Sequence, residues 1–383
     1  MSKNIPHVLI LGGGFGGLSA ANEIRNSLPS SKVRITLVDK KDWFMVGFVK
    51  LWIMNGTRTF ENSIGSLNNL QKKEIDFVKE EILKIDLENK TVKTTSKNIS
   101  YDYLIIALGA QLAPEKIPGL KENGLNLYDH NHLDEIHNKL IAIKSGNIAI
   151  AIMGMPYKCP PAPFEAALLI NSMLRNSEVR NSVKINFYSP APITLPAAGT
   201  DVSQQILEMI NSEKIIFYNS CKTISVEKNK LVFENAEADF DLLLAIPPHV
   251  APQIIYECGL AKPDGFIQIN RDCKTLFENV YAIGDVTSLP VGEKMAVPKA
   301  GIFAEGEGLA VAQNIVSKIQ NQKDLALFDG KGGCFIESGR NTASIIEVDM
   351  FSESKPITKL TESTKNYLNE KIQFEKERIE KWL

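Results

Sequence analysis

The sequence has few cysteine and histidine residues and no long apolar run. Its 383 residues include five cysteines and five histidines, and no two cysteines have the spacing C-x-x-C. A disulfide-stapled scaffold is therefore excluded, as are sites with zinc or iron–sulfur spacing. No stretch approaches the roughly 18 apolar residues of a membrane-spanning helix. The net charge of −2 provides no large basic surface, so we expect no nucleic-acid partner.

The overall composition indicates the class of protein and its compartment. Proportions of 44% hydrophobic and 23% charged residues are typical of a globular protein, and the length suggests two or three domains. The first expected strand begins at His7, which leaves no room for a signal peptide, so we expect a cytoplasmic protein. In that reducing compartment a disulfide would be catalytic rather than structural.

A glycine-rich turn lies between an expected strand, residues 7–11, and an expected helix. It has the spacing G-x-G-x-x-G, and its residues are Gly12, Gly14, Phe15 and Gly17. The three glycines permit a tight turn, close approach of the backbone to a pyrophosphate, and close packing of the helix on the strand. The helix N-terminus then offers free N–H groups and a positive dipole end to the phosphates.

An acidic residue follows the second expected strand, residues 33–38. Asp39 can accept hydrogen bonds from the ribose hydroxyls of an adenosine. A glycine triplet between a strand and a helix, with an acid at this distance, predicts a dinucleotide site. The alternative is a glycine-rich turn without a ligand.

Two later segments indicate that the dinucleotide is FAD. Residues 103–110 are expected to form a buried strand that enters a turn containing Ala107 and Gly109. Residues 275–285 are expected to form a second buried strand that ends at Gly284 and Asp285, where the carboxylate can reach a ribityl hydroxyl. Either segment alone would be an ordinary buried strand. Together with the first turn, they resemble the FAD signatures of the flavoprotein disulfide reductases that have two dinucleotide-binding domains.

The middle of the chain has a second strand and turn without the complete glycine pattern. Residues 147–153 predict a buried parallel strand, followed by Gly154. Pro156 and Cys159 occupy the positions of the second and third glycines, and Ser189 stands where a ribose-binding acid is expected. Proline has no N–H for a phosphate. We therefore expect a Rossmann-like domain with a degenerate nicotinamide site; the alternative is a diverged turn that binds NADH through other contacts.

Four further segments carry a recognisable pattern. They are residues 157–165, 247–248, 297–301 and 333–335. With the flavin segments they resemble the sulfide:quinone oxidoreductases and the flavoprotein subunit of flavocytochrome c sulfide dehydrogenase, from the first strand to about residue 350. The resemblance implies FAD-dependent oxidation of sulfide or polysulfide through a redox-active disulfide between Cys159 and Cys334. It also implies transfer of the electrons by way of FAD to a quinone or another acceptor.

The chain also departs from that family. No cysteine precedes Cys159, so the third active-site cysteine of many quinone-reducing members is missing. The cysteinyl–flavin bond of the flavocytochrome branch is missing for the same reason, and we expect FAD to be bound non-covalently. The expected absence of a signal peptide disfavours a periplasmic cytochrome c partner. Two alternative functions stay open: a type II NADH dehydrogenase-like enzyme and a non-catalytic flavoprotein that binds a partner.

Individual residues near the expected disulfide have candidate roles. Glu165 is expected in the first helical turn after Cys159, where it could shuttle protons or merely stabilise the helix N-terminus. The same positive helix end is expected to lower the thiol pKa of Cys159. Lys299 resembles the family's lysine beside the flavin pyrimidine, which stabilises the anionic reduced flavin. The other cysteines are interpreted as packing residues: Cys221, Cys258 and Cys273.

Two apolar patterns concern possible partners. Residues 43–54 could form core packing or line a quinone or sulfur channel. Near the C-terminus, Leu368, Ile372 and Ile379 recur at roughly helical spacing, which predicts an amphipathic helix. This helix could pack on the protein, form a homodimer contact or lie on the inner face of a membrane.

The sequence therefore predicts an α/β fold with two Rossmann-like dinucleotide-binding domains, similar to glutathione reductase, and a small C-terminal segment. The FAD domain is expected to be discontinuous, over residues 1–118 and 260–325. Residues 119–259 are expected to form the second domain, with the degenerate nicotinamide site. Residues 326–383 supply Cys334 and the amphipathic helix.

Overall fold

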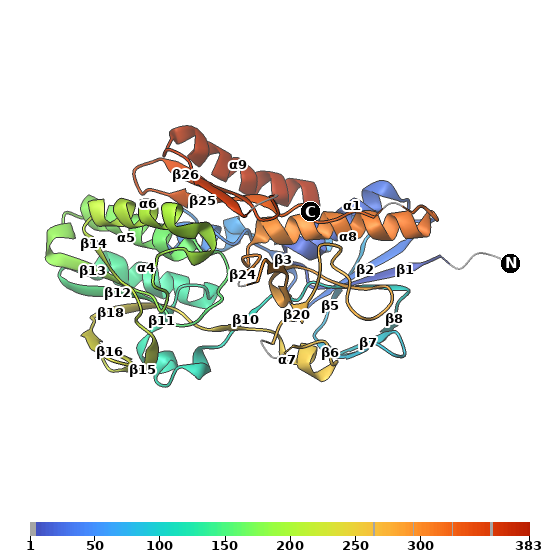
Figure 1. Cartoon of the computed structure of the whole chain (residues 1–383), viewed down its shortest axis with the longest axis horizontal. Coiled ribbons are helices and arrows are strands. Elements are labelled where there is room, and N and C mark those ends of the chain that lie inside the picture. Colours follow the sequence, from blue (N-terminus) through green and yellow to red (C-terminus); the bar gives the residue numbers. More distant parts are fainter. Residues whose placement is uncertain (1–4, 263–264, 294, 324, 353–354) are drawn as a thin grey trace.

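The computed structural model describes residues 5–262, 265–293, 295–323, 325–352 and 355–383. Two parallel sheets lie at opposite ends of the elongated molecule, and the C-terminal elements run along one side of both (Figure 1). No helix within the described ranges combines the length and the apolar character needed to cross a bilayer.

The first sheet is parallel throughout and has the strand order β21-β9-β1-β2-β5. Its strands are β1 (His7–Leu11), β2 (Arg34–Asp39), β5 (Asp76–Lys79), β9 (Tyr103–Ile106) and β21 (Val280–Ala282). Every residue of β1 is buried, as expected for a parallel strand covered on both faces. Helices α1 (Phe15–Ser27) and α8 (Gly301–Ile319) pack against each other beside this sheet.

The second sheet is also parallel and has the order β11-β18-β12-β13-β14. Its strands are β11 (Leu125–Asn126), β12 (Gly146–Ile152), β13 (Val183–Tyr188), β14 (Ile215–Tyr218) and β18 (Leu242–Ile246). The long helices of this half are α4 (Leu133–Ala142), α5 (Ala162–Asn176) and α6 (Gly199–Ser212). The α/β class predicted from the sequence is thus confirmed, with two parallel sheets.

Short antiparallel elements accompany each sheet. Strand β10 (Gln111–Leu112) pairs with β19 (His249–Val250), where the chain leaves the first half and returns to it. Two three-stranded antiparallel sheets consist of β6 (Ile82–Asp86), β7 (Thr91–Thr94) and β8 (Asn98–Ser100), and of β15 (Thr223–Glu227), β16 (Lys230–Phe233) and β17 (Glu237–Asp239). Helix α2 (Val49–Met54) follows the short strand β3 (Trp43–Phe44).

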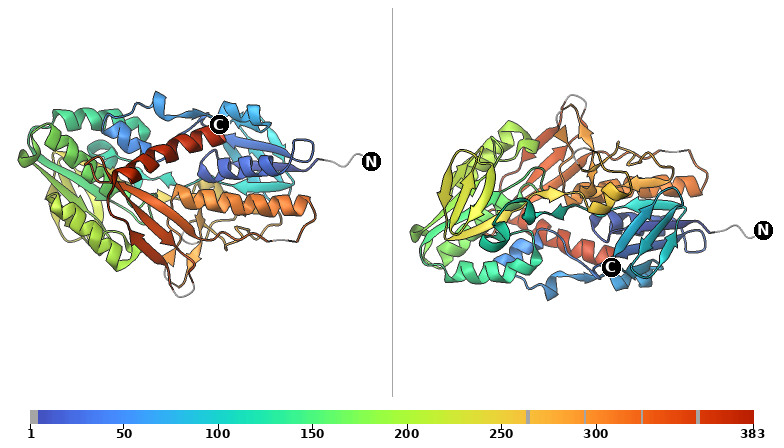
Figure 2. Two further views of the ribbon diagram at one scale, coloured as in Figure 1. Left: turned by 90° about the horizontal axis from the view of Figure 1, so that it is seen from above. Right: turned by 90° about the horizontal axis from the view of Figure 1, so that it is seen from below.

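The C-terminal segment forms an antiparallel sheet and a helix. Its elements are β25 (Lys331–Glu337), β26 (Ala343–Asp349), β27 (Ile357–Leu360) and α9 (Lys365–Trp382). Seen from above, α9 runs from this sheet toward α1 (Figure 2). The Trp382 ring is 1% exposed and packs edge-on against Phe15 and Phe44. The amphipathic helix therefore packs on the protein, which is one of its three expected locations.

The strand before Gly284 is shorter than the sequence suggests. It was expected from residue 275, but β21 begins at Val280. The backbone of Asn279 has a left-handed φ of 61°, and the N–H of Thr275 donates to the Val280 carbonyl. The chain therefore turns before the strand begins. This turn places Val280 beside Leu104 of β9.

Candidate active site

A cavity of about 280 Å³ opens at the carboxyl end of β1. It is lined by four segments that the sequence singled out: the first glycine turn, the turn after β9, the loop before α5 and the turn after β21. The predicted site residues on its wall are Gly14, Phe15, Ala107, Gly109, Cys159, Gly284 and Asp285. A second cavity of about 410 Å³ shares part of this wall and extends to Gly12 and Asp39. The two form one elongated space, suited to an extended ligand.

The three glycines of the first turn serve different purposes. A Cβ atom on Gly12 would lie 2.3 Å from the Ala107 carbonyl oxygen, and one on Gly17 would lie 1.9 Å from the Gly12 oxygen. These two glycines are therefore required by the fold itself. A Cβ on Gly14 would meet none of the described atoms within 4 Å. The space beside Gly14 belongs to the cavity, so the missing side chain leaves room for a bound group.

Asp39 is held firmly at the end of β2. One carboxylate oxygen accepts the Gly13 N–H at 2.7 Å, and the other accepts the Lys41 N–H at 2.8 Å. Each carboxylate oxygen can accept a further hydrogen bond. Since Asp39 lines the second cavity, its free acceptor capacity faces the place where a ribose would lie.

The turn after β21 is stabilised by a buried lysine. Lys299 donates from Nζ to the carbonyl oxygens of Asp285 and Thr287, at 2.8 and 2.9 Å. Burial raises the pKa of Asp285, although the charges of Lys158 and Lys299 oppose that rise. Lys299 thus lies beside the turn that bears Asp285, and its contact with a flavin pyrimidine stays a prediction.

These residues fit the cofactor predicted from the sequence. The first glycine turn and the N-terminus of α1 suit a pyrophosphate, Asp39 suits a ribose, and Asp285 suits the ribityl chain. The space beside Gly14 is a cradle that a side chain would fill. The elongated cavity is therefore built for FAD.

Cys159 and Cys334 come from different parts of the chain, and Cys159 lines this cavity. Cys159 lies in the loop before α5, and its N–H donates to the Lys299 carbonyl at 2.6 Å. Its carbonyl accepts the Tyr128 hydroxyl at 3.2 Å. Cys334 lies in the middle of β25. The structure holds both as free thiols, and they are near enough for charge on Cys334 to raise the pKa of Cys159.

The expected lowering of the Cys159 pKa is wrong in direction. Burial raises the thiol pKa of Cys159 well above its usual value, and the neighbouring charges of Cys334 and Glu165 raise it further. Burial also raises the pKa of Cys334 to about 12. Helix α5 begins at Ala162, whose backbone N–H lowers the thiol pKa of Cys159, but by less than burial raises it. The helix end therefore cannot offset the cost of placing a thiolate in this buried site.

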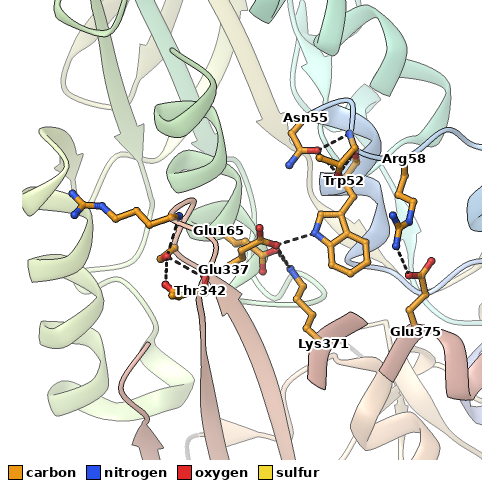
Figure 3. A network of polar contacts seen from close by, with 11 residues as sticks. Trp52, Asn55, Arg58, Glu165, Glu337, Thr342, Lys371 and Glu375 are labelled. Atoms are coloured by element: carbon orange, nitrogen blue, oxygen red, sulfur yellow. Dashed lines mark hydrogen bonds and ion pairs between the residues drawn. The ribbon is translucent and has the colours of Figure 1, made fainter. Parts of the chain in front are cut away.

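Glu165 belongs to a buried cluster of charges (Figure 3). Its carboxylate pairs with Lys371 of α9, and the same ammonium lies 3.2 Å from Glu337 of β25. Trp52 of α2 donates its indole N–H to Glu337 at 2.8 Å. Burial raises the pKa of Glu165 to about 7, although Lys371 opposes that rise. A carboxyl group with such a pKa can take up and release protons near neutrality.

Several residues that border the site had no assigned role from the sequence. Lys50 donates to the Tyr128 carbonyl at 2.9 Å, and burial lowers its pKa to about 7. It is the one charged residue within the apolar segment 43–54, a signal that could have identified it. Glu307 of α8 accepts the Gly284 N–H, and burial raises its pKa to about 8. Nothing in the sequence around Glu307 distinguishes it from a surface residue of a helix.

The apolar segment 43–54 is divided between the core and the wall of the first cavity, and its role in a quinone or sulfur channel stays a prediction. Val49, Ile53 and Met54 are buried in the core. Trp43, Phe44, Met45, Gly47, Lys50 and Leu51 line the first cavity. Most of the segment is core packing, and part of it faces the ligand space.

Comparison with known proteins gives consistent results. The family described as pyridine nucleotide-disulphide oxidoreductase matches residues 6–308. The sulfide-quinone reductase of Aquifex aeolicus (strain VF5) is 29% identical over 339 residues, covering 83% of this chain and 78% of that protein. The mitochondrial sulfide:quinone oxidoreductase of Mus musculus is 25% identical over 374 residues, covering 91% and 79%. The solved structure of the sulfide:quinone oxidoreductase from Aquifex aeolicus superposes with a TM-score of 0.89 and 26% identity, covering 98% of this chain and 92% of that one.

Proposed function

This chain belongs to the pyridine nucleotide-disulphide oxidoreductase family, and from that membership we propose that it binds FAD and oxidises sulfide or polysulfide, passing the electrons to a quinone. The observation that carries the proposal is that Cys159 lines the cavity suited to FAD, while α5, which bears Glu165, packs against β25, which bears Cys334. The similarity of this chain to the Aquifex aeolicus reductase, over most of both chains, supports sulfide as the substrate and a quinone as the acceptor.

The proposed chemistry begins with Cys159 and Cys334 joined as a disulfide. A hydrosulfide anion attacks one sulfur and the S–S bond breaks, which leaves a persulfide on that cysteine and a thiolate on the other. Glu165 accepts the proton that the persulfide then loses. The persulfide and the thiolate can then join through the added sulfur as a trisulfide, with loss of two electrons that FAD, held by the glycine turn and Asp285, would accept and pass on. Exchange with a further hydrosulfide anion releases HS–S⁻ and restores the disulfide.

Cationic side chains near the thiols favour an anionic substrate. Lys50 and Lys158 line the same cavity as Cys159, and burial lowers the pKa of both, so a bound anion would favour their charged forms. Such charges concentrate anions in a cleft of low dielectric constant. We assign the apolar part of segment 43–54 to the quinone, whose solubility in lipid would place the protein at the inner face of a membrane.

Sulfide should bleach the flavin of this protein in an anaerobic stopped-flow experiment, and NADH should not. Pro156 lacks the N–H that a nicotinamide dinucleotide phosphate would need. Ser189, in place of the ribose-binding acid, is 1% exposed, and its N–H donates to the Tyr218 carbonyl. Rapid bleaching by micromolar NADH, with none by sulfide, would instead support the type II NADH dehydrogenase alternative. Failure of both reductants would support a non-catalytic flavoprotein.

The purified protein should release free FAD when it is denatured by acid or heat. No cysteine precedes Cys159 in the chain, so the cysteinyl–flavin linkage of the flavocytochrome branch has no attachment point. The measurement is the flavin absorbance of the supernatant after the protein has been precipitated. Yellow colour that stays with the denatured chain would contradict non-covalent binding.

A further inference from the structure

We propose that the C-terminal helix α9 supplies a positioning residue, Lys371, which together with Glu337 decides whether Glu165 holds a proton beside the two thiols. The inference rests on the proposed function only in that Glu165 exchanges protons during the chemistry of Cys159 and Cys334. It gives α9 a role in the chemistry of a site to which it contributes no sulfur.

The placement of Lys371 is the first observation. Its side chain is fully buried, with a relative exposure of 0%, and it reaches from α9 between α5 and β25 (Figure 3). The ammonium contacts Glu165 and Glu337, and it lies 4.9 Å from the Trp52 ring and 5.0 Å from the Phe48 ring. A lysine is almost never buried so completely unless its charge is paired.

The charge balance of the cluster is the second observation. Two carboxylates share one ammonium, so full ionisation would leave an uncompensated negative charge in a buried site. A proton on one carboxyl group removes that charge. Glu337 also accepts the Trp52 N–H at 2.8 Å. Glu165 is 1% exposed, and its pKa is raised to about 7, so Glu165 is the group that holds the proton.

The groups facing Glu165 connect this proton to the thiols. Negative charge on Glu165 raises the pKa of Cys159 and of Cys334, and it also raises that of the buried Tyr128 hydroxyl. The positive charge of Lys371 lowers the pKa of Cys159. A thiol therefore ionises more readily when Glu165 is protonated than when it is charged.

The two partners of Glu165 act in opposite directions. Lys371 favours the charged carboxylate and lowers the pKa of Glu165, whereas the negative charge of Glu337 raises it. Glu337 also donates a backbone hydrogen bond to Glu165, which a side-chain substitution would leave in place. Replacement of either partner breaks the same cluster, yet the two replacements should shift the proton affinity of Glu165 in opposite senses.

The test measures the alkylation of Cys159 and Cys334 by iodoacetamide against pH, in reduced, FAD-loaded protein without sulfide or acceptor. Peptide mass spectrometry separates the two thiols from the other cysteines. The rate should rise with pH and show a shoulder near pH 7, where Glu165 becomes charged and suppresses thiolate formation. Lys371→Met should move the shoulder upward by about one pH unit or more, and Glu337→Gln should move it downward. Glu165→Gln should remove it.

Matched variants separate this role from general damage. Glu375→Gln alters another buried acid of α9, which pairs with Arg58 instead, and should leave the shoulder in place. Lys371→Arg keeps the charge and should restore the wild-type profile. Shifts in the same direction for Lys371→Met and Glu337→Gln, or a shoulder that survives Glu165→Gln, would overturn the inference. If Lys371→Met does not fold, the downward shift of Glu337→Gln decides the question.

This measurement does not depend on sulfide oxidation. If the alkylation profiles show the expected shoulders but sulfide does not reduce the flavin, the proposed function is refuted and the role of Lys371 stands. If sulfide reduces the flavin but the alkylation profile has no shoulder, the role of Lys371 is refuted and the proposed function stands.

Discussion

Replacement of Cys159 by serine should abolish flavin reduction by sulfide, with a fall in rate of at least about a thousandfold, while FAD stays bound. A serine hydroxyl cannot form the disulfide that a hydrosulfide anion attacks, and alkoxide is a poor leaving group in that exchange. Cys334→Ser should have the same effect. The double variant should be no slower than either single one, because the two sulfurs act as one unit. The measurement is anaerobic stopped-flow absorbance of the flavin.

The remaining cysteines provide the controls. Cys221→Ser and Cys258→Ser change residues interpreted as packing residues. In these variants sulfide should reduce the flavin at close to the wild-type rate. Full sulfide-dependent reduction in Cys159→Ser would defeat the disulfide proposal. So would an experimental structure in which the Cα atoms of Cys159 and Cys334 lie well beyond the ~7 Å that a disulfide can span.

Replacement of Gly14 by valine should give a folded protein that has lost its FAD. The backbone at Gly14 has φ −88° and ψ −167°, an extended conformation that valine adopts without strain. A Cβ there meets none of the described atoms, so the added methyl groups would enter the space left for the cofactor. Flavin absorbance per mole of protein should fall by at least about a hundredfold. Added FAD should no longer raise the melting temperature, since that rise requires binding to the folded state.

Gly17→Ala is the contrasting variant. Its added Cβ would lie 1.9 Å from the Gly12 carbonyl oxygen, so α1 would have to move away from β1. We expect a loss of about 2–3 kcal/mol in the free energy of unfolding, whether or not FAD is present. Retention of normal flavin content in Gly14→Val would show that the cofactor does not lie against this turn.

The fold and the cofactor site were largely predictable because their signals are local. A tight turn, a buried strand and an acid at its end are each encoded within a few consecutive residues, as in the segment from His7 to Asp39. Parallel strands have their carboxyl ends at the same edge, which brings Asp39 and Asp285 to one side of the sheet. Both now lie on the wall of the same cavity.

The thiol environment was not predictable in the same way. The position of Cys159 just before a helix suggested a lowered pKa, but burial by distant segments raises it. Glu165, Glu337 and Lys371 form one cluster although far apart along the chain, and Lys371 reads as an ordinary charge on an amphipathic helix. A sequence shows which residues can ionise, whereas the dielectric environment depends on tertiary packing.

The distribution of tryptophan makes this protein its own optical probe. The chain has three tryptophans: Trp43 lines the cavity, Trp52 is bonded to Glu337, and Trp382 packs against Phe15 on the cavity wall. Tryptophan emission overlaps a flavin absorption band, so excitation energy passes from the indoles to a flavin bound nearby. Intrinsic fluorescence therefore reports on flavin occupancy and on the seating of α9 together, with no label attached to the chain.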